Sequence, residues 1–256
     1  MGETMIVAGT DRLWVEDTGE GPPVVLIHPG IHDSTVWDTV VPLLEDLRSI
    51  RYDARDFGRS SASTQPFRAV DDLLAVLDAR GLEAAHLVGN SMGGASALSA
   101  ALEAPSRVLS LTVMCTAIAG YPWPDDDPDL ENAWAEASAS GDPQQVAEVS
   151  ARIWCAAGTD AALEAQLLAA ATADANHDAH EQDGPEHWSR VGEIAVPAAV
   201  VVGERDVASM VTANTDLAAA IAGAELVRLS EADHLPSLRD PRAVAEVVRR
   251  TVARAG

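Results

Sequence analysis

Ser91 lies in a sequence spacing that nucleophilic catalysis requires. The chain reads Leu-Val-Gly-Asn-Ser-Met-Gly-Gly over residues 87–94, so a glycine stands two positions before the serine and another two positions after it. A serine at a sharp turn from a strand into a helix exposes its hydroxyl, and the close approach of strand and helix leaves space for almost no side chain at those two positions. The pattern predicts that Ser91 is a nucleophile. It also predicts that the first N–H groups of the helix, beginning with that of Met92, point toward negative charge that forms beside the serine.

A serine nucleophile needs a base and an acid that orients the base, and the later part of the chain offers both. Histidine within hydrogen-bond reach activates the hydroxyl, and a carboxylate holds the imidazole in place. Asp206 follows the apolar run at 198–202, and His234 follows the run at 225–229. The order serine, aspartate, histidine is the one that this strand–turn–helix architecture requires. We therefore predict a catalytic triad of Ser91, Asp206 and His234.

The oxyanion of an acyl-transfer reaction needs backbone N–H donors. Met92 supplies one donor, and the second is expected from the turn that follows the apolar run at 24–27. Pro29 has no N–H to donate. The sequence therefore predicts an oxyanion hole formed by Met92 and Gly30, with Ile31 as the alternative to Gly30.

Other carboxylates and histidines have alternative interpretations. Glu204 competes with Asp206 but is expected to face away from the triad, and Asp233 is expected to accept hydrogen bonds within its loop. His28 could act as a base, although its position beside a strand end favours a structural hydrogen bond. Three further histidines have spacings that suggest a metal cluster: His177, His180 and His187. No fixed fourth ligand accompanies them, so we expect solvated side chains and no metal site.

The segments around these residues alternate between strand and helix patterns. Strands are predicted at 24–27, 49–53, 85–89, 108–114, 198–202 and 225–229, after an edge hairpin at 4–16. Helices are predicted at 34–47 (interrupted by Pro42), 67–80, 91–103, 212–222 and 241–254. This alternation predicts an α/β fold with a parallel sheet, right-handed crossovers and helices on both faces. The reactive side chains then gather at the carboxyl edge of the sheet.

The alternation breaks between residues 120 and 192. Three helix patterns replace the strands, at 129–139, 143–157 and 160–173. We expect a helical cap at 120–192, carried by a core made of residues 1–119 and 193–256. Four of the six tryptophans lie in this insertion and are candidates for the substrate pocket: Trp123, Trp134, Trp154 and Trp188.

The composition limits the possible partners. A formal charge of −23 argues against nucleic acid and anionic membrane surfaces. Lysine is absent, which excludes Schiff-base and P-loop lysine chemistry. The two cysteines are expected to be buried free thiols. With no signal peptide and no apolar run of membrane-spanning length, we expect a cytoplasmic protein that acts on a small molecule, and the sequence does not indicate its oligomeric state.

Five motifs together resemble the α/β-hydrolase fold superfamily over nearly the whole chain. They are His28-Pro29-Gly30 with Trp37 downstream, the loop at 53–60, Gly-Asn-Ser91-Met-Gly-Gly, Gly203-Glu-Arg-Asp206, and His234. The resemblance implies an eight-stranded, mostly parallel sheet, a helical cap after its sixth strand, and no cofactor. The sequence departs from the family's pattern at Pro29 and at Asp56, where the family usually has glycine.

These features predict a serine hydrolase that cleaves a small to medium, mostly uncharged carboxylic ester or lactone through an acyl-enzyme. The Arg-Asp variant of the 53–60 loop is similar to that of methylesterases acting on polyketide products. The string around Ser91 is similar to that of carbon–carbon bond hydrolases. Such a hydrolase, an acyltransferase or thioesterase on the same triad, and a non-catalytic ligand-binding protein on the same fold are the alternatives.

Overall fold

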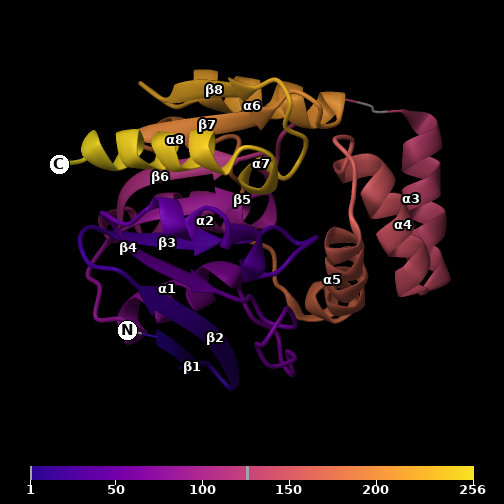
Figure 1. The fold of residues 1–256 in the computed structure, drawn as a ribbon, viewed down its shortest axis with the longest axis horizontal. Coiled ribbons are helices and arrows are strands. Elements are labelled where there is room, and N and C mark those ends of the chain that lie inside the picture. The colour runs from indigo at the N-terminus through magenta and orange to yellow at the C-terminus, as the bar shows by residue number, and fades with distance from the viewer. Residues whose placement is uncertain (1, 125–126) are drawn as a thin grey trace.

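An eight-stranded sheet forms the centre of the molecule (Figure 1). The computed structural model describes residues 2–124 and 127–256. The strands lie in the order β1-β2-β4-β3-β5-β6-β7-β8. Their bounds are β1 Gly2–Ala8, β2 Asp11–Thr18, β3 Pro23–Ile27, β4 Arg48–Tyr52, β5 Ala85–Asn90, β6 Val108–Met114, β7 Ala198–Gly203 and β8 Glu225–Leu229. The first two strands form the antiparallel edge, and all pairs from β4 to β8 are parallel, which confirms the predicted mostly parallel sheet.

Two hydrophobic layers cover the sheet, because successive residues of each buried strand face opposite sides. In β3, Val25 and Ile27 belong to one core, and Val24 and Leu26 belong to the other. The first core is closed by α1 (Ala69–Ala79), α2 (Met92–Glu103) and α6 (Ala208–Ala220). The second is closed by α8 (Pro241–Ala253) and the segment after β3. The short helix α7 (Pro236–Arg239) precedes α8.

The helix expected at 34–47 is not formed. The chain there makes two short 3₁₀ turns, Ser34–Trp37 and Val41–Leu43. Pro42 removes an N–H that an α-helix would need, and Asp33 caps the first turn by accepting the N–H of Thr35 at 2.8 Å. The segment still buries Trp37 completely, so its apolar side chains pack into the core although no α-helix forms.

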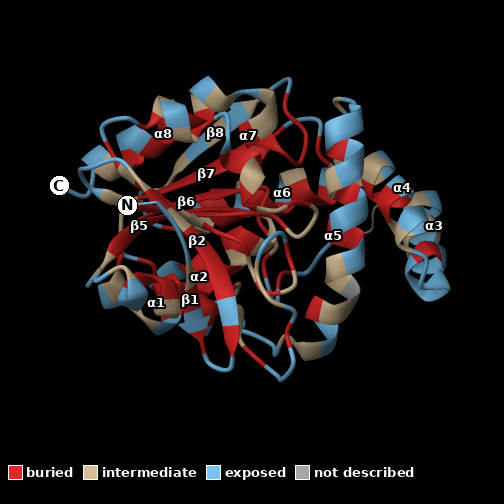
Figure 2. Ribbon diagram, turned by 60° about the horizontal axis from the view of Figure 1, so that its bottom comes forward, coloured by how far each residue is buried: buried red, intermediate tan, exposed pale blue. Residues whose placement is uncertain are grey.

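Three helices stand beyond the carboxyl ends of the strands, at the right of Figure 1. They are α3 (Pro128–Ser140), α4 (Pro143–Trp154) and α5 (Ala161–His180), and we call them the α3–α5 segment. The last of them is longer than predicted, because no proline or glycine interrupts it between its aspartate cap at Asp160 and residue 180. Figure 2 shows that its outer face is exposed while the sheet is buried. No helix in the described ranges is long and apolar enough to cross a membrane.

Candidate active site

Ser91 lies at the turn from β5 into α2 with φ 52° and ψ −114°. Few residues with a side chain adopt a positive φ, and such strain costs on the order of 1–3 kcal/mol. The neighbouring glycines make the turn possible. A Cβ atom on Gly89 would lie 2.2 Å from the carbonyl oxygen of Gly93, and one on Gly93 would lie 2.3 Å from that of Ile27. The strained turn therefore depends on both glycines, and it presents Ser91 to the cavity described below.

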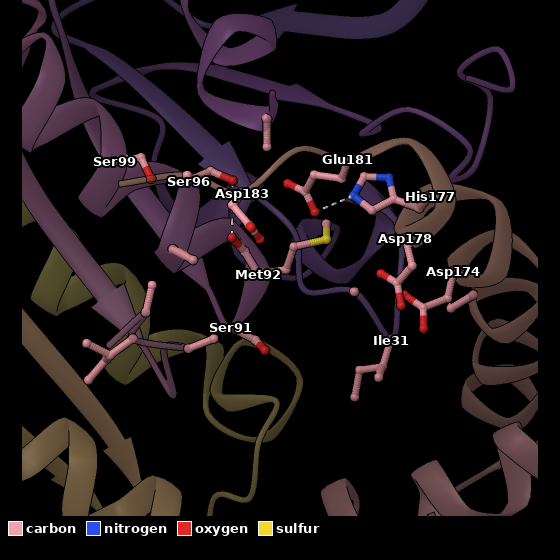
Figure 3. A pocket seen from close by; sticks show the side chains of 18 of the residues that line it. Ile31, Ser91, Met92, Ser96, Ser99, Asp174, His177, Asp178, Glu181 and Asp183 are labelled. Carbon is pink, nitrogen blue, oxygen red and sulfur yellow. Dashed lines mark hydrogen bonds and ion pairs between the residues drawn. The ribbon is translucent and has the colours of Figure 1, made fainter. Parts of the chain in front are cut away.

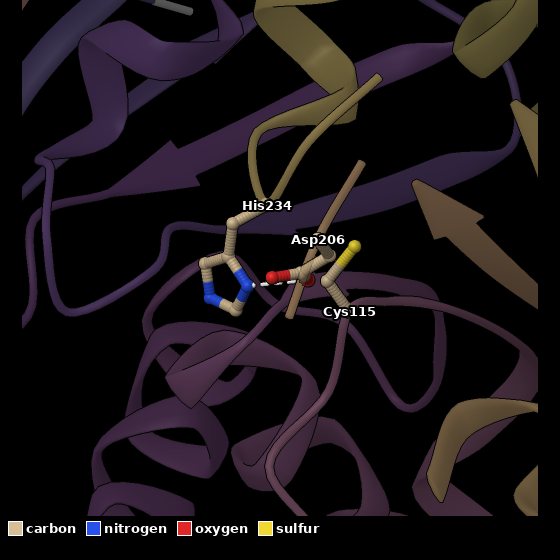
Figure 4. A group of neighbouring side chains, drawn as sticks. All are labelled: Cys115, Asp206 and His234. Atoms are coloured by element: carbon tan, nitrogen blue, oxygen red, sulfur yellow. Dashed lines mark hydrogen bonds and ion pairs between the residues drawn. The ribbon is translucent and has the colours of Figure 1, made fainter. Parts of the chain in front are cut away.

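His234 and Asp206 form a buried hydrogen-bonded pair (Figure 4). Nδ1 of the imidazole lies 2.7 Å from Oδ2 of the carboxylate. The other carboxylate oxygen, Oδ1, accepts the N–H of Val207 at 2.9 Å. With Nδ1 engaged by the acid, Nε2 is the ring nitrogen left for chemistry, and the histidine lines the same cavity as Ser91.

The two competing carboxylates have other partners. The side chain of Glu204 is 41% exposed and faces Arg228 at 3.6 Å. Asp233 is buried and accepts the backbone N–H of Leu235 at 3.1 Å and a guanidinium hydrogen bond from Arg239 at 2.7 Å. Of these three carboxylates, Asp206 is therefore the one that contacts the ring of His234.

Cys115 lies against the same pair, and the motifs of the sequence did not single it out. Its sulfur, the carboxylate of Asp206 and the ring of His234 have ligand atoms within 4.8 Å of one another (Figure 4). Burial, reinforced by the nearby Asp206, raises the pKa of the thiol well above its ordinary value, so the group stays protonated. The available signal was its position directly after β6, the strand between the one that carries Ser91 and the one that precedes Asp206.

The residues whose backbone N–H groups are the predicted oxyanion donors line the cavity together with Ser91. They are Gly30, Ile31 and Met92. None of the three donates a hydrogen bond to another described residue. A Cβ atom on Gly30 would lie 3.5 Å from the sulfur of Met92, so the turn after β3 packs against the start of α2. These N–H groups are therefore available to an anion beside the serine.

His28 is a structural residue in this arrangement. Its Nε2 accepts the N–H of Ala54 at 2.9 Å, so its Nδ1–H donates to the carbonyl oxygen of Pro29 at 2.8 Å. Burial lowers its pKa and keeps the ring neutral. With both nitrogens engaged, the ring holds the turn after β3 against the turn after β4.

The expectation of three solvated histidines between 177 and 187 is wrong for two of them. His187 is buried: it accepts the N–H of Ala119 at 3.1 Å and donates to the hydroxyl of Ser99 at 2.9 Å. Burial lowers its pKa to about 4. The imidazole therefore joins the chain after α5 to α2 as a neutral group.

His177 is the second buried histidine, because α5 extends beyond its predicted end and packs this ring against Phe57 and Phe67. Its Nδ1 lies 3.1 Å from the carbonyl oxygen of Arg55, and its Nε2 lies 3.3 Å from the carboxylate of Glu181. Burial alone lowers the pKa of His177, but the close contact with the carboxylate of Glu181 and the other nearby acceptors outweigh it and raise the pKa.

A cavity of about 680 Å³ runs from Ser91 to the α3–α5 segment. Part of its wall is apolar, with contributions from Ile31, Val146 and Leu167. Of the four predicted pocket tryptophans, three line it: Trp123, Trp134 and Trp154. Trp188 does not; it packs at right angles on Tyr121, with ring centroids 4.7 Å apart, and contributes to the core beneath.

One wall of the cavity is acidic. Its carboxylates come from the end of α5 and the chain that follows: Asp174, Asp178, Glu181 and Asp183 (Figure 3). The one arginine among the lining residues, Arg68, is bound by both carboxylate oxygens of Glu103 at 2.6 Å. The arginine is therefore already paired, and of the wall's carboxylates Glu181 is in contact with His177, which lines the cavity too. Burial and then the neighbouring Asp178 raise the pKa of Asp174 to about 6.

Replacing Asp174 by asparagine is expected to stabilise the protein above pH 6. The carboxyl of Asp174 has a pKa of about 6 in the folded state and about 4 in the unfolded state. Between about pH 4 and pH 6 it therefore holds its proton in the folded protein but has lost it in the unfolded protein. Its contribution to stability is therefore lost as pH rises through this window. After allowance for solvent screening, we expect a gain of about 1–2 kcal/mol in the free energy of unfolding at pH 7.5, and no gain at pH 4.

Urea unfolding of wild type and Asp174→Asn at the two pH values measures this difference. The exposed Glu20 supplies the control, Glu20→Gln, which should match wild type at both values. Equal stability of wild type and Asp174→Asn at pH 7.5 would show that the negative charge of Asp174 does not destabilise the folded protein.

Comparisons with known proteins place the chain in a family. Residues 22–169 match the family model of the alpha/beta hydrolase fold. Rhodomycin D methylesterase DauP of Streptomyces sp. (strain C5) is 40% identical over 155 residues, which are 56% of this chain and 51% of that protein. The 2-hydroxymuconate semialdehyde hydrolase of Pseudomonas sp. (strain CF600) is 39% identical over 130 residues, which are 48% of this chain and 46% of that protein. The chain thus spans about half the length of these curated relatives.

Solved structures agree over almost the full length. Est816, described as an N-acyl homoserine lactone degrading enzyme, is 26% identical with a TM-score of 0.76, over 96% of this chain and 99% of that one. A thermophilic esterase from Thermogutta terrifontis is 24% identical with a TM-score of 0.80, over 100% and 99% of the two chains, and shows the same fold. The family model matches more than half of this chain, and the structure has the strained serine turn and the mostly parallel sheet. The chain therefore belongs to the α/β hydrolase fold family.

Proposed function

We propose that the protein is a serine hydrolase of carboxylic esters or lactones that uses Ser91, His234 and Asp206. The observation that carries the proposal is the buried 2.7 Å contact between His234 and Asp206, with the histidine lining the same cavity as the strained serine. A nucleophile, a base and an orienting acid at the carboxyl edge of one sheet are the parts that acyl transfer requires. The methylesterase and the lactone-degrading enzyme among the relatives agree with this class of reaction.

The proposed reaction has two halves. In the first, the Oγ atom of Ser91 attacks the carbonyl carbon while Nε2 of His234 takes the hydroxyl proton, and the N–H groups of Met92 and Gly30 or Ile31 bind the oxyanion. His234 then gives the proton to the leaving alkoxide, which departs as an alcohol or, from a lactone, remains attached as a hydroxyl. In the second half, water attacks the acyl-enzyme with the same base, and Ser91 regains its proton. Asp206 stabilises the charged imidazole in both halves.

We propose that residues 120–192 form a cap over a core of residues 1–119 and 193–256. The support comes from the cavity, since Trp134 and Trp154 reach it from α3 and α4, and Asp174 reaches it from α5. In this arrangement the core supplies the reactive groups and the cap supplies most of the binding surface.

The acidic wall narrows the expected substrates to neutral or cationic ones. A carboxylate substrate would bring like charges together in a partly desolvated cavity, which costs on the order of a tenfold change in affinity or more. We expect p-nitrophenyl butyrate to be hydrolysed with a kcat/KM at least about tenfold above that of p-nitrophenyl hemisuccinate at low ionic strength. The difference should shrink as salt is added, and also in the Asp178→Asn/Glu181→Gln variant. A preference for the anionic ester would contradict this account of the wall.

A carbon–carbon bond hydrolase is the second candidate, because several relatives carry such names. Those names include a dienoate and dienedioates, which are carboxylates. Such anions suit the acidic wall poorly, and Arg68 is already bound to Glu103. A panel of p-nitrophenyl esters, lactones and a vinylogous 1,5-diketone carboxylate tests the two candidates. Turnover of the diketone alone would overturn the ester assignment.

A further inference from the structure

Trp154, the last residue of α4, contacts the proposed base with both its side chain and its backbone. The ring centroids of Trp154 and His234 lie 4.4 Å apart, with the ring planes at 40°. In addition, the N–H of His234 donates to the carbonyl oxygen of Trp154 at 3.3 Å. An aromatic ring in contact with an imidazole attracts it more strongly once the imidazole carries a positive charge. The residue is therefore placed to act on the charged form of His234.

The chain that follows Trp154 is fixed to the loop that carries His234. Asp233 accepts the N–H of Ala157 at 3.0 Å. Arg239 donates to Asp233 and to the carbonyl oxygen of Gly158, at 2.7 Å in each case. Asp233 is fully buried, so these hydrogen bonds are charge-assisted and poorly screened by water. The end of α4 and the histidine loop consequently form one unit, which holds the indole against the imidazole.

We infer that Trp154 is a positioning residue for His234, which keeps the ring in place and stabilises the imidazolium that forms when Ser91 gives up its proton. The inference rests on the proposed serine hydrolase function. It gives the α3–α5 segment a part in the chemistry as well as in binding. Loss of a cation–aromatic contact at a partly desolvated site lowers a rate or an affinity by roughly 2- to 30-fold.

The other titratable groups around His234 keep their identity when Trp154 is replaced. Cys155, the neighbour of Trp154, carries a buried thiol whose pKa burial raises to about 12, so it stays protonated across the tested range. Asp206, after β7, accepts the Nδ1–H of the histidine. Cys115, after β6, carries a thiol that burial keeps protonated. Asp233, the preceding residue, is paired with Arg239. A changed pH dependence in a Trp154 variant therefore reports the loss of the indole.

The test measures the second-order rate of fluorophosphonate labelling of Ser91 between pH 5 and pH 9, in wild type, Trp154→Phe and Trp154→Leu. This probe needs His234 as the base but does not require the natural substrate. We expect Trp154→Leu to label roughly 3- to 30-fold more slowly on the alkaline plateau. The midpoint of its acid limb should move to lower pH, by roughly half a unit to one unit, because the imidazolium has lost a stabilising partner. Trp154→Phe keeps an aromatic face and should fall between the two.

Trp134→Leu is the matched control, since this tryptophan lines the cavity without a ring contact to His234, and its acid limb should have the wild-type midpoint. A wild-type rate and midpoint in Trp154→Leu would overturn the inference alone. So would equally slow Phe and Leu variants with an unmoved midpoint, because that pattern reports packing. If the leucine variant does not fold, the phenylalanine variant carries the same test. Absence of Ser91 labelling in wild type would overturn the proposed function as well.

Discussion

Ser91→Ala is expected to lower kcat on p-nitrophenyl butyrate by roughly 10⁴- to 10⁶-fold. The variant loses the atom that forms the acyl-enzyme, and no other serine takes its place on a strained strand–helix turn. It should also fold at least as well as wild type, because alanine keeps the Cβ atom and the Oγ atom of Ser91 makes no hydrogen bond within the described structure. Thermal unfolding and steady-state kinetics on the same preparation separate the two effects.

Ser96 provides the comparison for Ser91, because it lines the same cavity one helical turn further along α2. Its hydroxyl donates to the carbonyl oxygen of Met92 at 3.1 Å, so it is committed to a helix hydrogen bond. Ser96→Ala should retain an acyl-enzyme that can be trapped. Activity of Ser91→Ala within tenfold of wild type would mean that the hydroxyl of Ser91 does not perform the reaction.

Asp206→Asn is expected to lower kcat by roughly 10³- to 10⁴-fold while the fold stays intact. The backbone N–H of Val207 binds Oδ1 at 2.9 Å, and an asparagine would keep its carbonyl oxygen at that position. Its NH₂ group would then face Nδ1 of His234, which favours the tautomer with the proton on Nε2. A base that already carries a proton on Nε2 cannot accept one from Ser91.

The control for Asp206 is Glu204→Gln, which changes the competing carboxylate of the same turn. Glu204 is exposed and meets only Arg228 among its described ion-pair partners, so kcat should stay within about twofold of wild type. Kinetics of both variants on one ester decide between the carboxylates. A large loss in Glu204→Gln with little loss in Asp206→Asn would reverse the assignment of the acid.

The parts of the site that depend on local backbone geometry could be predicted from the sequence. The serine turn could be predicted from Gly89 and Gly93, because the turn leaves no space for a side chain at either position. A Cβ atom there would lie within 2.3 Å of backbone atoms. The alternation of apolar runs and helices predicted the parallel sheet, since strands buried on both faces have a distinctive composition. The helix expected at 34–47 failed because Pro42 outweighed the helical spacing of its apolar residues.

The parts that depend on packing between distant segments could not be predicted. His177 and His187 stand in mostly polar stretches of sequence, and only the docking of α5 and the following loop buries them. The acidic wall could not be predicted for the same reason, because its carboxylates come together only when α5 and the chain after it line the cavity. The sequence predicted a mostly uncharged substrate, and the wall adds that any charge on the substrate should be positive. Trp188 was predicted to line the pocket because it lies in the insertion. It packs on Tyr121 instead and does not reach the cavity.

The contact between Trp154 and His234 connects the part of the molecule that carries the proposed catalytic residues with the α3–α5 segment. The serine turn and the sheet edge belong to the proposed core, whereas α4 belongs to the segment that we propose as a cap. If the end of α4 holds the base, a change in the cap alters the reaction rate as well as the choice of substrate. Engineering of the pocket should therefore leave the Asp233–Arg239 pair and Trp154 in place.

Covalent labelling tests whether Ser91 is a nucleophile that His234 and Asp206 activate. Intact protein is treated with a fluorophosphonate at neutral pH, digested, and analysed by mass spectrometry. The account predicts one adduct, on the peptide that contains Ser91, formed in wild type and lost in Ser91→Ala, and formed far more slowly in Asp206→Asn. An unlabelled wild type that still hydrolyses p-nitrophenyl butyrate, or an adduct on another residue, would contradict it.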